Sequence, residues 1–301
     1  PPGTGKTTTL VETIYETLRR ETQVLVCAQS NTAVDWISEK LVDHGVPVLR
    51  IGNPTKVNDK MLSFTYERRF ENHPDYPQLW AIRNNIRQIR ENRKKGENVH
   101  DKLNRLRDRA DELEMCIRTS LFNEARVVAC TLVGSANKIL VGHNFSTIFI
   151  DEAAQALEAA CWIGIRRANR VVFAGDHHQL PPTIKNYDAA RQGLAITLME
   201  RIVCNQPEVV TLLKVQYRMN DAIIQFSSKW FYDGKVESAP EVTGRSVLDL
   251  DTPMMWIDTS NPEVRNKYQL LMNSGQFGEE LMNDKVDFSE QYVGENHGRI
   301  N

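Results

Sequence analysis

The chain has 301 residues, of which 41% are hydrophobic and 25% are charged, and its formal net charge is −2. This composition is typical of folded globular proteins and argues against a disordered chain, while the length allows two domains of ordinary size. The sequence shows neither a signal peptide nor an apolar run near the ~20 residues that span a bilayer. We therefore expect a soluble, intracellular (cytoplasmic) protein with no membrane partner.

The cysteines and the chain ends are informative in a different way. The five cysteines lie far apart and form no C-x-x-C pair. This spacing does not fit a structural zinc site, and reduced thiols are the simplest account. The chain starts at Pro1 rather than at methionine, inside a motif that lacks its first residue, and it stops at Asn301 without a helix cap. We expect a fragment of a longer protein.

The first half of the chain alternates short apolar runs with longer amphipathic ones. The apolar runs are rich in Val and Ile and predict strands buried on both faces, at residues 24–28, 46–51, 126–130, 147–150 and 171–174. The amphipathic runs predict helices at residues 6–20, 32–44 and 153–166. Alternating strands and helices indicate an α/β fold with a doubly wound parallel sheet.

One long charged segment, residues 79–122, interrupts this alternation. Its apolar residues recur at helical spacing in two stretches, and Gly96 and Asn98 supply a turn between them. We therefore predict an inserted helical hairpin. Residues 83–126 contain twelve Lys or Arg and eight Asp or Glu, a net charge of +4. This charge suits a solvated helix face, and contact with a phosphate backbone is the alternative.

A new run of elements begins after Cys204. Residues 209–215 predict a strand, residues 220–232 a helix and residues 254–257 another strand, whereas the polar tail at 261–293 predicts an exposed loop. We place the first domain at residues 1–206, with an insertion at about 56–124, and an incomplete second domain at residues 207–301.

The first residues carry a phosphate-binding pattern. Pro1-Pro2-Gly3-Thr4-Gly5-Lys6-Thr7 matches G-x-x-x-x-G-K-S/T except for the first glycine. In this pattern the glycines let backbone N–H groups curl around phosphates, the lysine reaches the β- and γ-phosphates, and the hydroxyl binds Mg²⁺. We expect ATP and Mg²⁺ as cofactors. The phosphate-binding residues would be Gly3, Thr4, Gly5, Lys6, Thr7 and Thr8.

Two acidic residues follow the apolar strand predicted at 147–150. Asp151 and Glu152 would lie at the carboxyl end of that strand, the edge at which parallel sheets bind ligands. We expect Asp151 to hold Mg²⁺ and Glu152 to orient and deprotonate the attacking water, an arrangement that suits hydrolysis.

Two further segments carry candidate catalytic residues. Gln179 follows the next strand, within residues 175–182, and could hydrogen-bond the γ-phosphate or the attacking water. The adjacent His177 and His178 have no third metal ligand nearby, so we interpret them as loop residues. Arg218, within residues 216–219, could reach the γ-phosphate across a cleft between two domains, although a surface salt bridge is its ordinary interpretation.

Together these motifs resemble those of the superfamily 1 helicases. Asp151-Glu-Ala-Ala-Gln155, Gln179-Leu180-Pro181 and residues 216–219 resemble the branch that contains the nonsense-mediated-decay RNA helicase and senataxin. Cys27-Ala-Gln-Ser-Asn-Thr-Ala-Val-Asp35 matches motif Ia of that branch, with Gln29 where proline is usual. Val128-Ala-Cys-Thr131, followed by Gly134, resembles its next DNA- or RNA-facing motif. The resemblance covers residues 1–232 and fades beyond them.

The resemblance implies a P-loop NTPase fold with two RecA-like domains, of which the second begins in this chain. ATP would bind in the cleft, and single-stranded DNA or RNA would cross the top. Ser30, Asn31 and Thr131 would contact the phosphate backbone without reading its sequence. Members of this branch move 5′ to 3′. The adenine-contacting glutamine of the family would precede residue 1, and the later motifs of the second domain would follow residue 301.

Two other classes of function fit part of the sequence. A P-loop ATPase that remodels proteins shares the phosphate loop and the acidic pair but leaves motif Ia and the Gln179 loop unexplained. A nucleotide-gated binding switch with slow hydrolysis fits all of the motifs. Glu152 disfavours a kinase because it suits an attacking water, and the absence of an N-K-x-D motif disfavours a GTPase.

Overall fold

The computed structural model of the protein describes residues 1–92, 100–246 and 253–254. The chain divides between Leu213 and Lys214 into two compact units, called here the first and the second unit. Residues 207–213 belong to the first unit. The domain ranges 1–206 and 207–301 remain a prediction from the sequence. None of the described helices is both long enough and apolar enough to cross a membrane.

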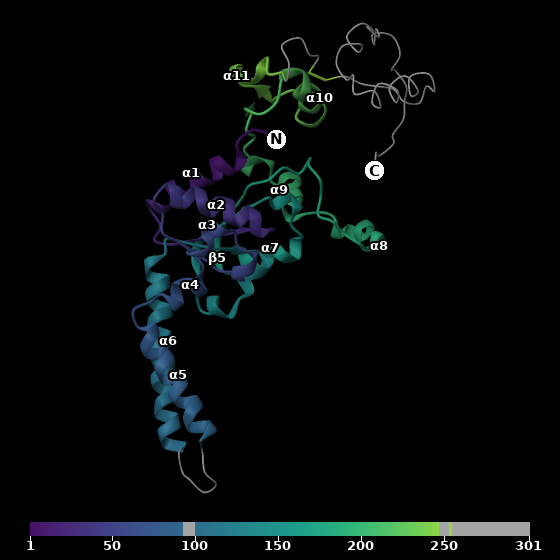
Figure 1. The fold of residues 1–301 in the computed structure, drawn as a ribbon. Helices are drawn as coiled ribbons and strands as arrows, with labels where there is room; N and C mark the ends of the chain where they lie inside the picture. The colour runs from purple at the N-terminus through teal and green to yellow at the C-terminus, as the bar shows by residue number, and fades with distance from the viewer. Residues whose placement is uncertain (93–99, 247–252, 255–301) are drawn as a thin grey trace, which may run out of the picture. The chain divides into compact units, whose positions relative to one another are not determined.

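The first unit is built on a five-stranded parallel sheet flanked by helices (Figure 1). The strand order is β2-β3-β1-β4-β5. The strands are β1 (Val24–Ala28), β2 (Val48–Arg50), β3 (Val127–Thr131), β4 (Phe145–Asp151) and β5 (Ala168–Phe173). They confirm the predicted strands, with ends that differ by a few residues. The four strands β1 to β4 are almost entirely buried because helices cover both faces, as the runs of Val and Ile predict.

Two apolar cores lie on the two faces of this sheet. In β1, Val24 and Val26 pack in one core, whereas Leu25 and Cys27 pack in the other, because successive side chains of a strand point to opposite faces. The first core also receives the buried faces of α1 (Lys6–Leu18) and α2 (Asn31–Asp43). The second receives residues from α6 (His100–Glu124), α7 (Glu158–Ile165) and α9 (Leu198–Asn205).

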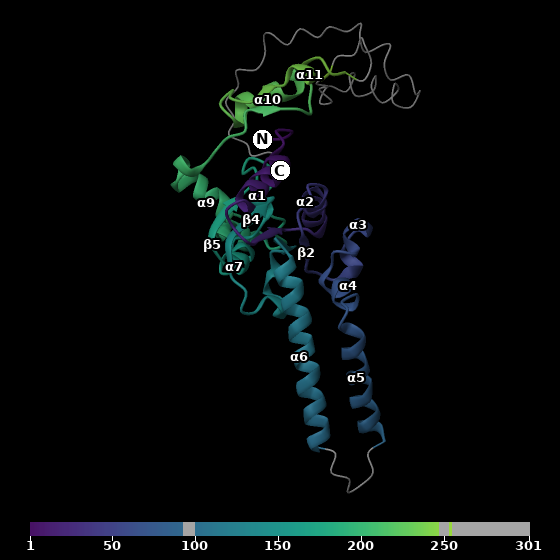
Figure 2. The same ribbon diagram turned by 90° about the vertical axis from the view of Figure 1, so that its left-hand side faces the viewer.

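The inserted hairpin is confirmed as two long helices, α5 (Tyr76–Glu91) and α6, which run side by side (Figure 2). Leu79 of α5 and Ile117 of α6 are fully buried where the pair joins the core. Farther out the surface is charged, and Arg83 pairs with Glu114 between the two helices. The predicted turn at Gly96 and Asn98 lies outside the described residues.

Shorter elements fill the connections of the first unit. They are η1 (Pro54–Lys56), α3 (Asp59–Leu62), α4 (Tyr66–Glu71), η2 (Val133–Ala136), η3 (Lys138–Leu140), η4 (Ala153–Gln155), α8 (Tyr187–Ala189), η5 (Ala190–Leu194) and η6 (Pro207–Val209). The predicted helix at 153–166 is wrong at its start, because η4 precedes α7 and Leu157 between them is extended. The backbone N–H of Ala153 donates to the carbonyl of Ala174 at 2.9 Å, so this turn is tied to the end of β5.

The second unit pairs two short parallel strands, β6 (Val215–Gln216) and β7 (Glu237–Ser238), with α10 (Asp221–Phe231) and α11 (Pro240–Thr243). The predicted helix at 220–232 is confirmed by α10, which Asn220 caps. The predicted strand at 209–215 is wrong. Pro207 starts a 3-10 turn, and of residues 209–215, all of which the structure describes, Val215 alone lies in a strand. Residues 255–257 and 261–293, predicted as part of a strand and as a loop, lie outside the described residues.

Candidate active site

The carboxyl ends of three strands bring the candidate residues to one edge of the sheet. Ala28 at the end of β1 is in register with Thr131 on one side and with Asp151 on the other. The backbone N–H of Leu132 donates to the carbonyl of Ala28 at 3.0 Å, which links the two strand ends. Ligands of open parallel sheets bind at this edge because the loops that follow the strands meet there.

The loop before α1 is shaped by its two glycines. Gly3 and Gly5 have φ of 73° and 74°, in the left-handed region that glycine adopts without a steric penalty. The loop closes on itself, because Thr4 Oγ1 and Lys6 Nζ both donate to the carbonyl of Pro1, at 2.9 and 3.0 Å. Thr8 is exposed on the first turn of the helix. Loop and helix N-terminus together match a phosphate cradle.

Thr7 and Asp151 meet across 144 positions of sequence. Thr7 Oγ1 donates to Asp151 Oδ2 at 3.1 Å. The second oxygen, Oδ1, is buried and has no hydrogen-bond partner among the described residues. Burial raises the pKa of Asp151. The backbone N–H of Glu152 lowers it by hydrogen bonding, whereas the charge of the Glu152 side chain raises it. Burying a carboxylate oxygen without a hydrogen-bond donor costs free energy. A carboxylate and a hydroxyl side by side are oxygen ligands of the type that Mg²⁺ prefers.

Glu152 has an unusual backbone. Its φ of 51° and ψ of 38° lie in the left-handed region, which is uncommon for residues other than glycine. Strain of this kind costs ~1–3 kcal/mol and clusters at functional sites. It turns the chain out of β4 and presents Glu152, half-buried, immediately after the Asp151 carboxylate.

Gly175 lies against this turn. A Cβ at residue 175 would meet the backbone nitrogens of Ala154 and Ala153 at 3.0 and 3.2 Å, and the sulfur of Met199 at 2.7 Å. Two of these three atoms belong to the backbone and cannot swing aside. The turn after Glu152 therefore depends on the absence of a side chain at residue 175.

Replacing Gly175 by alanine is expected to destabilise the first unit by ~1–3 kcal/mol, the usual cost of overpacking, and to displace the turn that carries Glu152. Thermal unfolding of the intact protein would measure the first effect, and ATP hydrolysis the second. Gly244→Ala is the control, because a Cβ there meets nothing within 4 Å. Equal behaviour of the two variants would contradict the prediction.

Gln179 is anchored by an acidic residue of its own loop. Its Nε2 donates to Asp176 Oδ2 at 2.8 Å, and Asp176 Oδ1 accepts from the backbone N–H of His178 at 3.2 Å. Asp176 is buried. The rings of His177 and His178 lie 3.9 Å apart, and burial lowers the pKa of His177. The part of the chain that the structure describes contains no group of three metal-ligating residues.

The three residues predicted to face nucleic acid lie at the ends of β1 and β3. Ser30 caps α2, its Oγ accepting from the backbone N–H of Ala33 at 3.2 Å. Asn31 is the first residue of that helix. Thr131 Oγ1 accepts from the backbone N–H of Gly134 at 3.0 Å. Both hydroxyls accept from the backbone and keep their own O–H as a donor.

Arg218 lies in the second unit, on a turn shaped by Gln216. The buried amide of Gln216 accepts from the backbone N–H groups of Arg218 and Met219, both at 2.8 Å, and donates to the carbonyl of Met219 at 2.6 Å. These bonds hold the turn, and the side chain of Arg218 is exposed. Its predicted contact with the γ-phosphate stays a prediction.

A pocket of about 680 Å³ lies beside Lys6 in the first unit. Its lining combines Lys6 with mostly apolar residues of β5 and α9 and with Gly175. Its volume is in the range of small-molecule sites.

Comparison with protein families gives two matches, both described as AAA domain, at residues 1–187 and 194–284. The chain belongs to this AAA-domain family.

Three relatives of this AAA-domain chain are named as helicases or as a DNA-binding protein. The DNA-binding protein SMUBP-2 of Mesocricetus auratus is 35% identical over 280 residues, which cover 86% of this chain and 28% of the relative. The DNA polymerase alpha-associated DNA helicase A of Schizosaccharomyces pombe is 34% identical, with 86% and 41% covered. The ATP-dependent helicase upf1 of the same organism is 31% identical, with 93% and 29% covered.

These matches confirm the resemblance to superfamily 1 helicases. The AAA-domain chain spans less than half the length of each of these three relatives.

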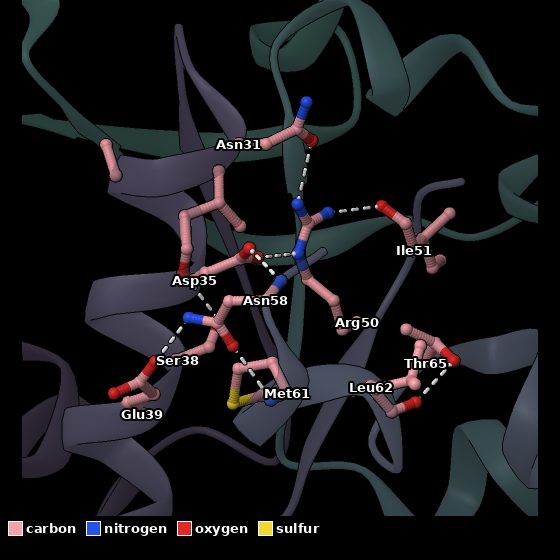
Figure 3. A network of polar contacts seen from close by, with 12 residues as sticks. Asn31, Asp35, Ser38, Glu39, Arg50, Ile51, Asn58, Met61, Leu62 and Thr65 are labelled. Atoms are coloured by element: carbon pink, nitrogen blue, oxygen red, sulfur yellow. Dashed lines mark hydrogen bonds and ion pairs between the residues drawn. The ribbon is translucent and has the colours of Figure 1, made fainter. Parts of the chain in front are cut away.

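A buried polar network in this AAA domain was not predicted from the sequence. Arg50 at the end of β2 bonds Asp35 and Asn31 of α2 (Figure 3). The role of Asp176 as the anchor of Gln179 was not predicted either. The available signal was weak: an arginine within an apolar strand, and an aspartate at a helix position that otherwise faces the core.

Proposed function

We propose that this chain is the motor core of an ATP-dependent helicase or translocase that moves along single-stranded DNA or RNA. The observation that carries the proposal is one sheet edge shared by two sets of residues. Asp151, which accepts a hydrogen bond from Thr7, ends β4, and β4 lies next to β1 in the sheet. The loop after β1 leads into Ser30 and Asn31. A nucleotide and a nucleic acid bound at neighbouring strand ends would be coupled through the sheet.

The proposed chemistry is hydrolysis of the γ-phosphate of ATP. Lys6 would leave the Pro1 carbonyl to bind the β- and γ-phosphates, beside backbone N–H groups of Gly3 to Thr8. Thr7 and Asp151 would hold Mg²⁺, which when bound neutralises charge on the phosphates. The buried, unpaired Oδ1 of Asp151 supports that assignment.

Proton transfer and charge stabilisation fall to three other residues. Glu152 would accept a proton from the attacking water. Gln179, anchored by Asp176, would hydrogen-bond the γ-phosphate or that water. Arg218 would contribute from the second unit by stabilising charge in the transition state. Movement in the 5′ to 3′ direction is part of the proposal and rests on the family alone.

The proposal is tested by steady-state ATP hydrolysis of the intact protein, with and without single-stranded DNA and RNA, over a series of salt concentrations. We expect strong stimulation that weakens as salt rises, because phosphate contacts release counterions. The polymer that stimulates more is the preferred track. Hydrolysis that responds to neither polymer would overturn the proposal and leave a protein remodeller or a nucleotide-gated switch.

A further inference from the structure

The side chain of Asn31 is held in one orientation by Arg50. Arg50 Nη2 donates to Asn31 Oδ1 at 2.9 Å. A guanidinium has only donors, so the amide oxygen must face it and the NH₂ group must face away, as Figure 3 shows. Within the described part of the chain, Nδ2 has no hydrogen-bond acceptor. Asn31 therefore presents two N–H donors at the edge of the sheet.

Arg50 is itself immobilised. Its side chain is 0% exposed, and Nε donates to Asp35 Oδ1 at 2.7 Å while Nη1 donates to the carbonyl of Ile51 at 2.6 Å. The second oxygen of Asp35 accepts from the backbone N–H of Asn58 at 3.0 Å. A buried ion pair is tolerated only when its remaining donors and acceptors have hydrogen-bond partners. Here the guanidinium of Arg50 donates to Asp35, to the carbonyl of Ile51 and to Asn31.

The backbone beside Arg50 leaves space for this arrangement. A Cβ at Gly52 would lie 2.8 Å from Arg50 Nη1. Because the guanidinium is fully enclosed, it could not move aside without losing its contacts. Gly52 therefore gives a way to disturb the guanidinium without changing any charge.

We propose that Arg50, held by Asp35, is a positioning residue for nucleic acid: it locks the Asn31 amide so that its N–H groups donate to phosphate oxygens of a single strand. The inference rests on the proposed function. Phosphate is the matching partner because an amide that cannot flip offers donors only, at the N-terminus of α2, where the helix dipole also favours an anion. The hydroxyls of Ser30 and Thr131 add neutral donors that do not read bases.

The test replaces Arg50 by lysine in the intact protein. Lysine keeps the charge opposite Asp35 but cannot reach Asp35, Ile51 and Asn31 together, because it lacks the planar fork. We expect the affinity for fluorescently labelled oligothymidylate and oligouridylate, measured by anisotropy, to fall about 10-fold, as loss of one oriented hydrogen bond to a charged phosphate implies. In an Asn31→Ala background the same replacement should cause no further loss.

Two other variants separate positioning from folding. Gly52→Ala should weaken oligonucleotide binding when Asn31 is present. It should have no effect on binding in a protein that already carries Asn31→Ala. Arg126→Lys is the matched control: its guanidinium also donates to backbone carbonyls, including those of Thr22 at 2.7 Å and Glu21 at 3.0 Å, but at the opposite end of the sheet. It should lower thermal stability and leave the affinity unchanged.

The outcomes are distinct. If Arg50→Lys does not fold, Gly52→Ala carries the test. Wild-type affinity in the folded variants, or an equal loss with and without Asn31, would overturn the positioning role while the proposed function stands. Wild-type protein that binds neither oligonucleotide would overturn the proposed function and this inference together.

Discussion

Replacing Glu152 by glutamine in the intact protein is expected to reduce ATP hydrolysis by ~10²- to 10⁴-fold, the usual contribution of a general base, while ATP still binds. Glutamine has nearly the same shape and can keep the strained turn, but it cannot accept the proton of the attacking water. The binding residues Lys6, Thr7 and Asp151 are unchanged by the substitution. Single-turnover hydrolysis measures the chemical step, and equilibrium binding of a labelled nucleotide measures affinity.

Glu158→Gln is the control for this experiment. Glu158 is also an acidic residue close to the turn that carries Glu152. It lies in the first turn of α7 and forms an ion pair with Arg201 at 2.9 Å. Partly exposed ion pairs contribute little, so we expect near-normal hydrolysis. Near-normal turnover in Glu152→Gln as well would remove Glu152 from the role of base.

Replacing Arg218 by alanine is expected to lower kcat by ~10³-fold or more with little loss of nucleotide affinity. An arginine that contacts the γ-phosphate only in the transition state typically contributes ~10³ to 10⁵ in rate, or about 4–7 kcal/mol of barrier. The exposed side chain and the turn held by the Gln216 amide mean that the substitution should not disturb the fold. Steady-state kinetics with saturating nucleic acid would separate kcat from KM.

Lys235→Ala in the second unit is the matching control. Lys235 is a cation in an exposed ion pair with Asp233, at 3.0 Å, and should be silent. An unchanged kcat in Arg218→Ala would return that arginine to an ordinary surface position. A loss of nucleotide affinity without a loss of kcat would place it in ground-state binding instead.

Much of the first unit follows from local sequence. Buried strands require runs of Val and Ile, and phosphate loops require glycine at positions of positive φ, so both leave a pattern in a few consecutive residues. The start of α1 and all of β1 accordingly lie where the sequence predicts them. The strand predicted at 209–215 failed for the opposite reason. An apolar run becomes a strand only when a partner strand is present, and the structure describes none at residues 209–213. The pairing with β7 begins at Lys214, whose carbonyl accepts from the backbone N–H of Glu237 at 2.8 Å.

Three features follow from local sequence: the order of strands and helices, the glycine loop before Lys6 and the acidic pair at the end of β4. Each depends on neighbours in the chain. Which distant residues meet depends on the tertiary fold: Thr7 with Asp151, Asp176 with Gln179, and Arg50 with both Asp35 and Asn31. Arg50 is on β2, the edge strand, and α2 follows β1, with β3 between the two strands. That order is set by burying apolar faces over the whole sheet, and no local pattern encodes it.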